Sequence, residues 1–397
     1  MNNPAQRKSD LDTPCLILDL DILERNLKKM QAVAGAAGKN LRPHAKTHKC
    51  SLLAKMQLAA GAVGICAAKV SEAEALVQAG IPNVLVTGPV ATPEKIARLI
   101  SLLRTAPFLM TVVDHPASIE LLEKLLAGAG LTLDVLVDLD IGHGRTGVAP
   151  GKAMELAERV LASDRLRLRG IQAYAGNVQH IPRYRDRRAA SLKGLKQAAA
   201  VFRQLQSRAE SCTIFSASGT GTAKIDLAIP ELTELQAGSY ALMDAEYLAI
   251  ECADGSECAD YQPALTMLTT VVSVGHGRQV KTGVGGAAED HHCDHGIFKR
   301  LPGHNVARLD VTFDQSHHLC RSCFRQRFTL RGNWRVFQCA ERAADSLTSL
   351  VHCLLDRGIL ADIIHNALDT LGILPATIRQ GQYVFIFRVF FSVIDRG

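Results

Sequence analysis

Short apolar segments alternate with amphipathic helical patterns along residues 41–244. Helical patterns occupy, for example, residues 72–79, 93–103, 117–126, 152–162 and 189–208. Eight strands, each followed by a helix, predict an α/β fold with a parallel (β/α)8 barrel. The active site of such a barrel lies at the C-terminal ends of its strands. The expected strands begin near Leu41, Gly64, Asn83, Leu109, Leu133, Leu168, Cys212 and Glu234.

The composition is that of a soluble globular protein. At 397 residues, with 47% hydrophobic and 21% charged residues, the chain has room for a barrel and a smaller second domain. The net charge of +6 comes without a basic stripe interleaved with aromatic residues, so we expect no nucleic-acid partner. There is no apolar run of membrane-spanning length and no signal-peptide pattern at residues 1–12. We therefore expect a cytoplasmic protein without a membrane partner, whose eleven irregularly spaced cysteines are reduced thiols.

One lysine stands within a cluster of cations where the first expected strand ends. Residues 42–49 read R-P-H-A-K-T-H-K, with Lys46 in the middle. A lysine in a dry pocket beside other cations has a lowered pKa, which frees its amine to attack a carbonyl group. The pattern therefore indicates a Schiff-base lysine, and a solvated basic loop is the alternative.

A glycine-rich loop follows the fifth expected strand. Residues 142–147 read G-H-G-R-T-G, which matches a dinucleotide-binding fingerprint literally. That fingerprint opens a helix directly after its third glycine, whereas Pro150 and Gly151 intervene here. For Arg145, an ion pair with Asp138 or Asp140 is the simplest structural interpretation.

Two further loops have the composition of an anion site. Residues 216–222 read S-A-S-G-T-G-T, and residues 234–244 end the eighth expected strand with a Gly-Ser-Tyr segment. Small residues let backbone N–H groups approach an anion, and hydroxyl groups add donors. Phosphate groups bind after the seventh and eighth strands in many (β/α)8 enzymes.

Four motifs, in this order along the chain, resemble the D-threonine aldolase and D-serine dehydratase family, fold-type III enzymes with an alanine-racemase-type N-terminal barrel of TIM type. They are R-P-H-A-K-T-H-K (42–49), D-x-G-x-x-R-T-G-V (140–148), G-x-Q-x-Y-x-G (170–176) and E-x-x-x-G-S-Y-x-x-M-D (234–244). The resemblance implies that Lys46 carries pyridoxal 5′-phosphate, that Arg145 faces the pyridine nitrogen and that Tyr174 lines the pocket. His180 is expected to reach the substrate as a catalytic residue. The expected phosphate contacts are Ser218, Gly219, Thr220, Gly238, Ser239 and Tyr240.

The resemblance also implies an activity. Members act on small D-3-hydroxy-amino acids with pyridoxal phosphate and a divalent metal (Mn²⁺, Mg²⁺ or Zn²⁺), commonly as homodimers. The metal acts as a Lewis acid on the β-hydroxyl group. We expect retro-aldol cleavage to glycine and an aldehyde. The alternatives are a D-serine or 3-hydroxyaspartate dehydratase and a cofactor-binding protein without turnover.

The resemblance also suggests three regions. Residues 1–25 form an N-terminal strand and lead-in that join a second, β-rich domain, residues 26–250 form the barrel, and residues 251–397 complete the second domain. The family's metal signature, a histidine with a cysteine or aspartate two positions on, suggests His292 and Asp294 as ligands, and the pair His291 and Cys293 has the same spacing. Residues 317–323 hold a C-x-x-C with neighbouring histidines, which suggests zinc.

The amino-acid composition of the sequence changes near Gly277. Nine of the twelve Phe residues and the sole Trp, Trp334, lie beyond this point. A reading-frame change there would produce such a composition. On this hypothesis the residues beyond about 280 do not form the native second domain.

Overall fold

The computed structural model describes Lys8 and residues 11–276, 279–282, 298–300, 306–309 and 334–335, with side chains as far as Leu268. The chain divides into two units, Met1–Gln338 and Cys339–Gly397, and every described residue belongs to the first. The predicted metal ligands His292 and Asp294, the pair His291 and Cys293, and the stretch at residues 317–323 lie outside the described residues.

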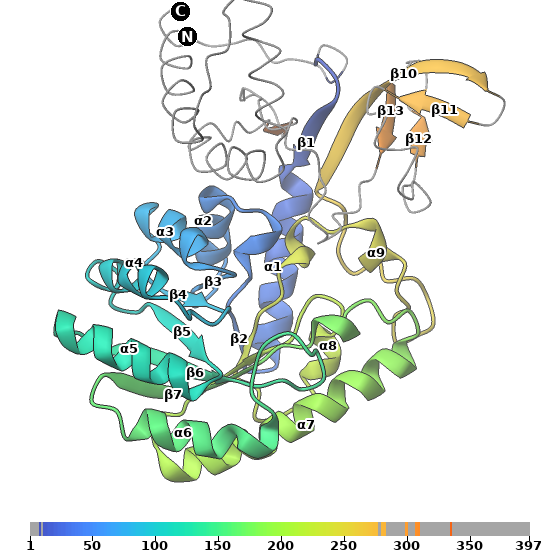
Figure 1. Ribbon diagram of the computed structural model, residues 1–397. Coiled ribbons are helices and arrows are strands. Elements are labelled where there is room, and N and C mark those ends of the chain that lie inside the picture. The colour runs from blue at the N-terminus through green and yellow to red at the C-terminus, as the bar shows by residue number, and fades with distance from the viewer. Residues whose placement is uncertain are drawn as a thin grey trace, which may run out of the picture. The chain divides into compact units, whose positions relative to one another are not determined.

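A curled, TIM-like sheet of eight parallel strands forms the centre of the first unit (Figure 1). The strands follow the order β2-β9-β8-β7-β6-β5-β4-β3. Strands β3 to β5 are buried along their whole length, as expected for a parallel sheet covered on both faces. The predicted parallel α/β sheet is confirmed. Its strands are β2 (Asn40–Leu41), β3 (Ile65–Ala67), β4 (Val84–Val86), β5 (Met110–Val113), β6 (Leu133–Asp138), β7 (Leu166–Ala173), β8 (Ile214–Ala217) and β9 (Glu234–Leu235).

The two ends of the curled sheet meet beyond β2. The Cys66 N–H donates to the Pro43 carbonyl at 2.9 Å, and His44 forms an isolated parallel bridge with Cys66. Below this contact Arg42 forms a buried ion pair with Glu234 of β9, with Nε 2.8 Å from Oε1. Arg42 Nη1 also donates to Asn83 Oδ1 at 2.7 Å. One guanidinium therefore ties together β2, β9 and the start of β4.

Helices connect successive strands and pack against the outside of the sheet (Figure 1). Their starts follow local signals: Asp19 caps the first, and proline stands at the first turn of α4 and of α5. The helices are α1 (Leu20–Ala36), α2 (Ser51–Ala59), α3 (Val70–Gln78), α4 (Pro93–Leu103), α5 (Pro116–Ala129), α6 (Ala153–Leu161), α7 (Tyr184–Arg208), α8 (Ala223–Asp226) and α9 (Ala245–Leu248). In the described residues, no helix is both long and apolar enough to cross a membrane.

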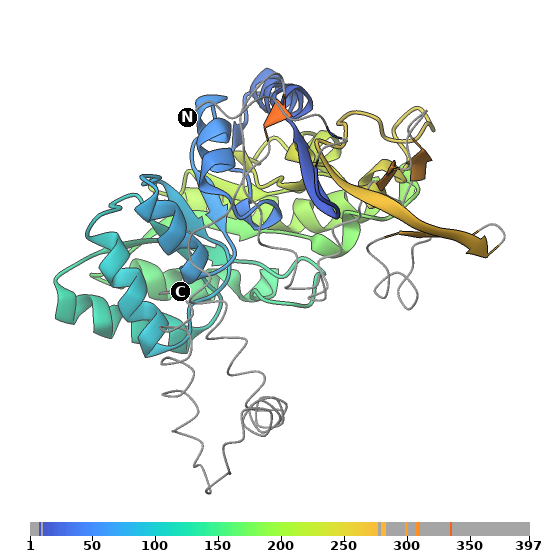
Figure 2. The same cartoon turned by 90° about the horizontal axis from the view of Figure 1, so that it is seen from above.

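The N-terminal strand belongs to a different, antiparallel sheet. Strand β1 (Cys15–Asp19) pairs with β10 (Leu265–His276), and the two run side by side in both views (Figures 1 and 2). This sheet has the order β12-β13-β10-β1-β14, and β11 also pairs with β10. The N-terminal strand thus pairs outside the eight-stranded parallel sheet. The further strands are β11 (Gln279–Thr282), β12 (Phe298–Arg300), β13 (Val306–Leu309) and β14 (Trp334–Arg335).

Two expectations from the sequence are settled by the fold. No helix opens after the third glycine of residues 142–147; instead Leu139 and Val148 bridge, and a short 3-10 turn (Pro150–Lys152) precedes α6. The dinucleotide interpretation is therefore wrong. The expectation of reduced thiols is also wrong for one pair, because Cys252 and Cys258 are joined in a disulfide bond on the loop after α9. Four cysteines in the described part of the chain, Cys15, Cys50, Cys66 and Cys212, are free thiols, as predicted.

Candidate active site

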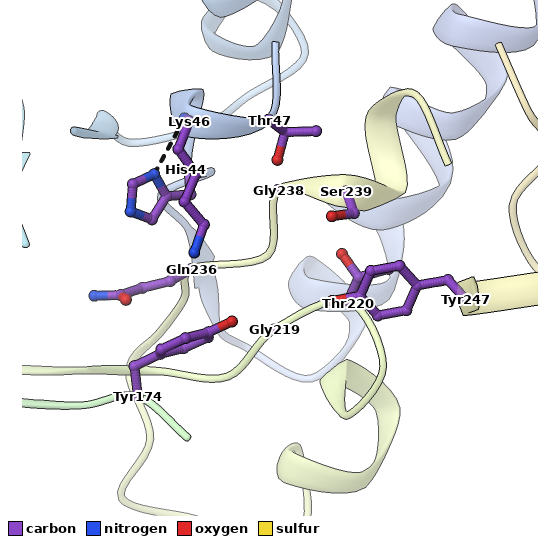
Figure 3. Close-up of a pocket in the computed structure, with 10 residues that line it drawn as sticks. All are labelled: His44, Lys46, Thr47, Tyr174, Gly219, Thr220, Gln236, Gly238, Ser239 and Tyr247. Carbon is purple, nitrogen blue, oxygen red and sulfur yellow. Dashed lines mark hydrogen bonds between the residues drawn. The ribbon is translucent and has the colours of Figure 1, made fainter. Parts of the chain in front are cut away.

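Lys46 lies on a short 3-10 turn, Ala45–Thr47, that follows β2. Pro43 disfavours helix in the residue before it, so the chain stays extended through Arg42. His44 then starts the turn: its Nδ1 accepts the N–H of Lys46 at 3.3 Å, and its Nε2 lies 3.1 Å from Thr87 Oγ1. The turn directs the lysine side chain into a pocket at the C-terminal ends of the strands (Figure 3).

The pocket opens to solvent and is bounded by segments far apart in the sequence. In Figure 3, Lys46, Gln236 and Tyr174 gather at one end, and Thr220, Ser239 and Tyr247 at the other. A concave site with a few convergent polar groups is where a small ligand would bind. The lining residues are His44, Lys46, Thr47, Tyr174, Gly219, Thr220, Gln236, Gly238, Ser239 and Tyr247.

The electrostatics of this pocket make the Lys46 amine easier to deprotonate than that of an ordinary lysine. Burial, and then the charge of Arg145, lowers the pKa of Lys46 from 10.5 to about 8. Burial also places the pKa of His44 well below 6.5, and the Lys46 charge adds to this effect. The Lys46 ammonium lies 5.0 Å from the centre of the Tyr174 ring. Near neutral pH this lysine therefore has a sizeable fraction of free, nucleophilic amine, and the solvated basic loop does not describe it.

The opposite end of the pocket is built from backbone and hydroxyl groups. Among the described residues no acceptor receives the N–H groups of Gly219, Thr220 or Ser239. A Cβ at Gly238 would lie 2.7 Å from Thr47 Oγ1, and one at Gly221 would lie 2.0 Å from the Gln179 carbonyl oxygen. Only glycine permits these close approaches. The result is a concave surface of N–H donors, which is the chemistry that binds an anion.

A hydrogen bond to Asp138 of β6 holds the loop that carries Arg145. Thr146 Oγ1 donates to Asp138 Oδ2 at 2.9 Å, and Gln172 Nε2 donates to Asp138 Oδ1 at 2.8 Å. Gln236, which lines the pocket, donates in turn to Gln172 Oε1 at 3.0 Å. Burial raises the pKa of Asp138 to about 6. A buried polar chain thus links the floor of the pocket to the Arg145 loop.

Arg145 itself is exposed and lies beside the pocket, with its guanidinium carbon 6.0 Å from the Tyr174 ring centre. The predicted ion pair with Asp138 or Asp140 is not supported, because both carboxylates have other partners. Asp138 accepts from Gln172 and Thr146, and Asp140 Oδ1 accepts the N–H groups of residues 142–144 at 2.9–3.0 Å.

The side chains of the remaining predicted site residues lie in different places relative to the pocket. Ser218 is buried next to Gly219, and its hydroxyl lies near the buried carboxylate of Asp226, whose pKa it acts to lower. The Tyr240 side chain turns into the core, where its hydroxyl accepts from Gln57 Nε2 at 3.3 Å, while its N–H donates to Thr220 Oγ1 at 3.0 Å. His180 does not line the pocket; its ring lies 4.2 Å from that of Tyr247, and its Nε2 lies 3.7 Å from Glu246 Oε2.

Sequence reasoning missed four of the lining residues: His44, Thr47, Gln236 and Tyr247. Three of them stand inside motifs that were singled out, and Gln236 lies two residues before Gly238, so strand alternation could have placed it inward. Tyr247 lies beyond the last motif, and no local signal marks it.

Comparison with known proteins agrees with this architecture. The family model for the alanine racemase N-terminal domain matches residues 18–246, more than half of the chain. The chain therefore belongs to the alanine racemase N-terminal domain family.

Individual relatives give a finer picture. The chain is 39% identical over 274 residues to a 3-hydroxy-D-aspartate aldolase of Paracoccus denitrificans (strain Pd 1222), covering 68% of this chain and 71% of the relative. It is similar to the crystal structure of D-threonine aldolase from Filomicrobium marinum, with a TM-score of 0.68, 35% identity and coverage of 78% of this chain and 85% of that one. A D-threo-3-hydroxyaspartate dehydratase of Delftia sp. (strain HT23) is more distant, at 30% identity over 66% of this chain and 68% of the relative.

Proposed function

We propose that this protein is a pyridoxal-phosphate-dependent lyase that cleaves D-3-hydroxy-amino acids to glycine and an aldehyde. The observation that carries the proposal is the pocket itself: a buried lysine with a pKa of about 8 lies across it from N–H groups that have no acceptor among the described residues. The aldolase relatives support the same reaction class.

The residues present fit this cofactor. A carbonyl carbon requires a free amine, which Lys46 supplies, and a phosphate group requires donors, which Gly219, Thr220 and Ser239 supply. Ser218, buried beside Gly219, is a further proposed contact of the phosphate group. The other proposed contacts are Gly238, through its close approach to the lysine turn, and the backbone of Tyr240.

Each side chain then has a definable task. The cofactor, when bound, supplies the electron sink for bond cleavage next to the amino group. Tyr174 packs against one side of the pocket, and Arg145 offers a hydrogen bond to the pyridine nitrogen without protonating it. We assign to His180 the removal of the hydroxyl proton of the substrate, because it adjoins the lining residue Tyr247 and pairs with Glu246.

The proposal includes a divalent metal that activates the β-hydroxyl group of the substrate. His292 and Asp294 remain its proposed ligands, from the second, β-rich domain formed by residues 1–25 and 251–397. The barrel, residues 26–250, holds the cofactor. We also propose a homodimer located in the cytoplasm.

The test is direct. Purified protein with pyridoxal phosphate, D-threonine and Mn²⁺ is expected to release acetaldehyde, and a chelator is expected to abolish release while cofactor binding persists. The variant Lys46→Ala is expected to lose both cofactor binding and acetaldehyde release.

Other products would indicate a different activity. Ammonia without aldehyde, from D-serine or 3-hydroxyaspartate, would identify a dehydratase, which the more distant relative favours. Cofactor binding without any product would identify a binding protein without turnover. An active chain without any cofactor would contradict the proposal.

A further inference from the structure

Arg187 of α7 is a buried cation whose hydrogen bonds go to main-chain carbonyl groups. It is 1% exposed. Its Nε donates to the Gly221 carbonyl at 2.9 Å, its Nη1 to those of Ile181 and Pro182 at 2.6 and 3.1 Å, and its Nη2 to that of Glu251. Arg187 forms no salt bridge with a carboxylate among the described residues, although the charge of Glu251 acts to raise its pKa. Burial is the larger effect and lowers the pKa of Arg187, because a buried charge without a directly bonded counter-ion is costly.

The carbonyl bound by Arg187 Nε belongs to the anion-binding loop. Gly221 is held from both sides, because its N–H donates to Gln179 Oε1 at 3.1 Å. The Thr222 N–H donates to the Gly219 carbonyl at 3.3 Å and closes the turn. The N–H groups of Gly219 and Thr220 consequently face the pocket with fixed orientation.

This end of the pocket contains no cation of its own among the described lining residues. Lys46 is the only lysine or arginine in the lining set, and it lies at the other end (Figure 3). The guanidinium of Arg187 contacts this loop from outside the pocket, through the Gly221 carbonyl group. In a water-poor environment a nearby positive charge attracts an anion more strongly than it would in water.

We propose that Arg187 is the positioning residue and the buried positive charge of the phosphate end of this pocket, acting through Gly221 without touching the ligand. The inference rests on the proposed function, since the anion is the phosphate group of the cofactor. It assigns to Arg187 the preference of the pocket for a phosphorylated ligand over the same ring without phosphate.

The experiment measures equilibrium binding and does not require turnover. Dissociation constants for pyridoxal phosphate and for pyridoxal are determined by spectroscopic titration in the wild-type, Arg187→Met and Arg187→Lys proteins. Arg203→Met is the matched control, since Arg203 lies on the same helix but is exposed and pairs with Glu231. Thermal unfolding is recorded for all four proteins.

In Arg187→Met we expect affinity for pyridoxal phosphate to fall by about tenfold or more while affinity for pyridoxal changes less than about twofold. Arg203→Met is expected to behave as wild type. Equal loss for both ligands in Arg187→Met would show a merely structural role and overturn the inference, as would no loss for either.

The variant Arg187→Lys distinguishes the effect of the positive charge from the effect of the number of hydrogen-bond donors. It also provides the test if Arg187→Met does not fold. It keeps the charge but has fewer donors, so we expect a lower melting temperature and a ligand preference within about threefold of wild type. If Arg187→Lys loses the preference for pyridoxal phosphate over pyridoxal, the inference is overturned. If wild-type protein binds neither ligand, the proposed function fails and the inference fails with it, whereas wild-type binding with an unaffected Arg187→Met fails the inference alone.

Discussion

Arg145 is the side chain whose charge most clearly tunes Lys46 from outside the lining of the pocket. After burial, the Arg145 charge is the next cause that lowers the pKa of Lys46 to about 8. Removing it in Arg145→Met should therefore raise that pKa. Since only the free amine reacts with an aldehyde, the pH midpoint for covalent attachment of pyridoxal phosphate should move upward.

Borohydride trapping across pH 6 to 10 measures this midpoint. Arg167→Met is a suitable control, because Arg167 is an exposed residue that pairs with Asp134 on β6. An unchanged or lowered midpoint in Arg145→Met would show that Arg145 does not act on the lysine.

Gly221 is expected to be intolerant of any side chain. A Cβ there would lie 2.0 Å from the backbone oxygen of Gln179, so the loop must shift. We expect Gly221→Ala to lower the unfolding free energy by about 1–3 kcal/mol and to weaken pyridoxal phosphate binding. The control is Gly151→Ala, where a Cβ meets nothing within 4 Å. Chemical denaturation of both variants gives the comparison, and equal behaviour would refute the close approach.

At the scale of elements, the buried pair Arg42–Glu234 links the end of β2 to the neighbouring strand β9, close to where the curled sheet closes. Its side chains are 4% and 3% exposed. Removing one partner leaves an uncompensated charge, so Glu234→Gln should cost about 3–5 kcal/mol of unfolding free energy. The exposed pair Arg208–Glu158 is the control, and Glu158→Gln should cost less than about 0.5 kcal/mol.

Urea denaturation of these two variants, with Arg42→Met/Glu234→Leu as a third, measures the cost. We expect the double variant to recover much of the loss, since apolar groups then replace both charges. A double variant as unstable as Glu234→Gln alone would contradict this account of the sheet closure.

Strands and helices with a clear period were predictable within a few residues. Strands β4 and β5 begin one residue from the predicted starts, and α4 spans its predicted range. Helix α7 begins at Tyr184 and not at residue 189, because its first turn buries Arg187 through backbone carbonyl groups of distant loops. The burial of Arg187 is not accompanied by a periodic pattern of apolar residues, so the sequence does not reveal it.

The position of Lys46 and of the loops at residues 216–222 and 234–244 around one pocket was predictable, because each lies at a strand end and has a distinctive sequence motif. The inward position of Tyr247 and the Cys252–Cys258 disulfide were not. Both depend on how the chain after β9 folds back, including the bridge between Glu251 and Glu257, and nothing local specifies that path.

For the molecule as a whole, His48 should make stability depend on pH. Burial lowers its pKa from 6.5 to about 4. The unfolded chain therefore takes up a proton below about pH 6.5, while the folded chain resists until about pH 4. Stability is complete above this window and is lost as pH falls through it. The loss should be roughly 3 kcal/mol once the pH has fallen to about 4.

The variant His48→Asn tests the assignment, since asparagine keeps an acceptor for the Cys50 N–H but does not titrate. Its unfolding free energy, followed from pH 7 to 4, should fall less steeply than that of wild type. Parallel curves for the two proteins would show that His48 is not the group responsible.

The central claim is that Lys46 is the cofactor lysine, and one measurement tests it most directly. Protein incubated with pyridoxal phosphate near pH 8, reduced with borohydride and digested, is analysed by peptide mass spectrometry. The account predicts a single phosphopyridoxyl group on the peptide that contains Lys46, and none in that region when Lys46→Ala is treated alike. Label spread over exposed lysines, with Lys46 unmodified, would contradict it.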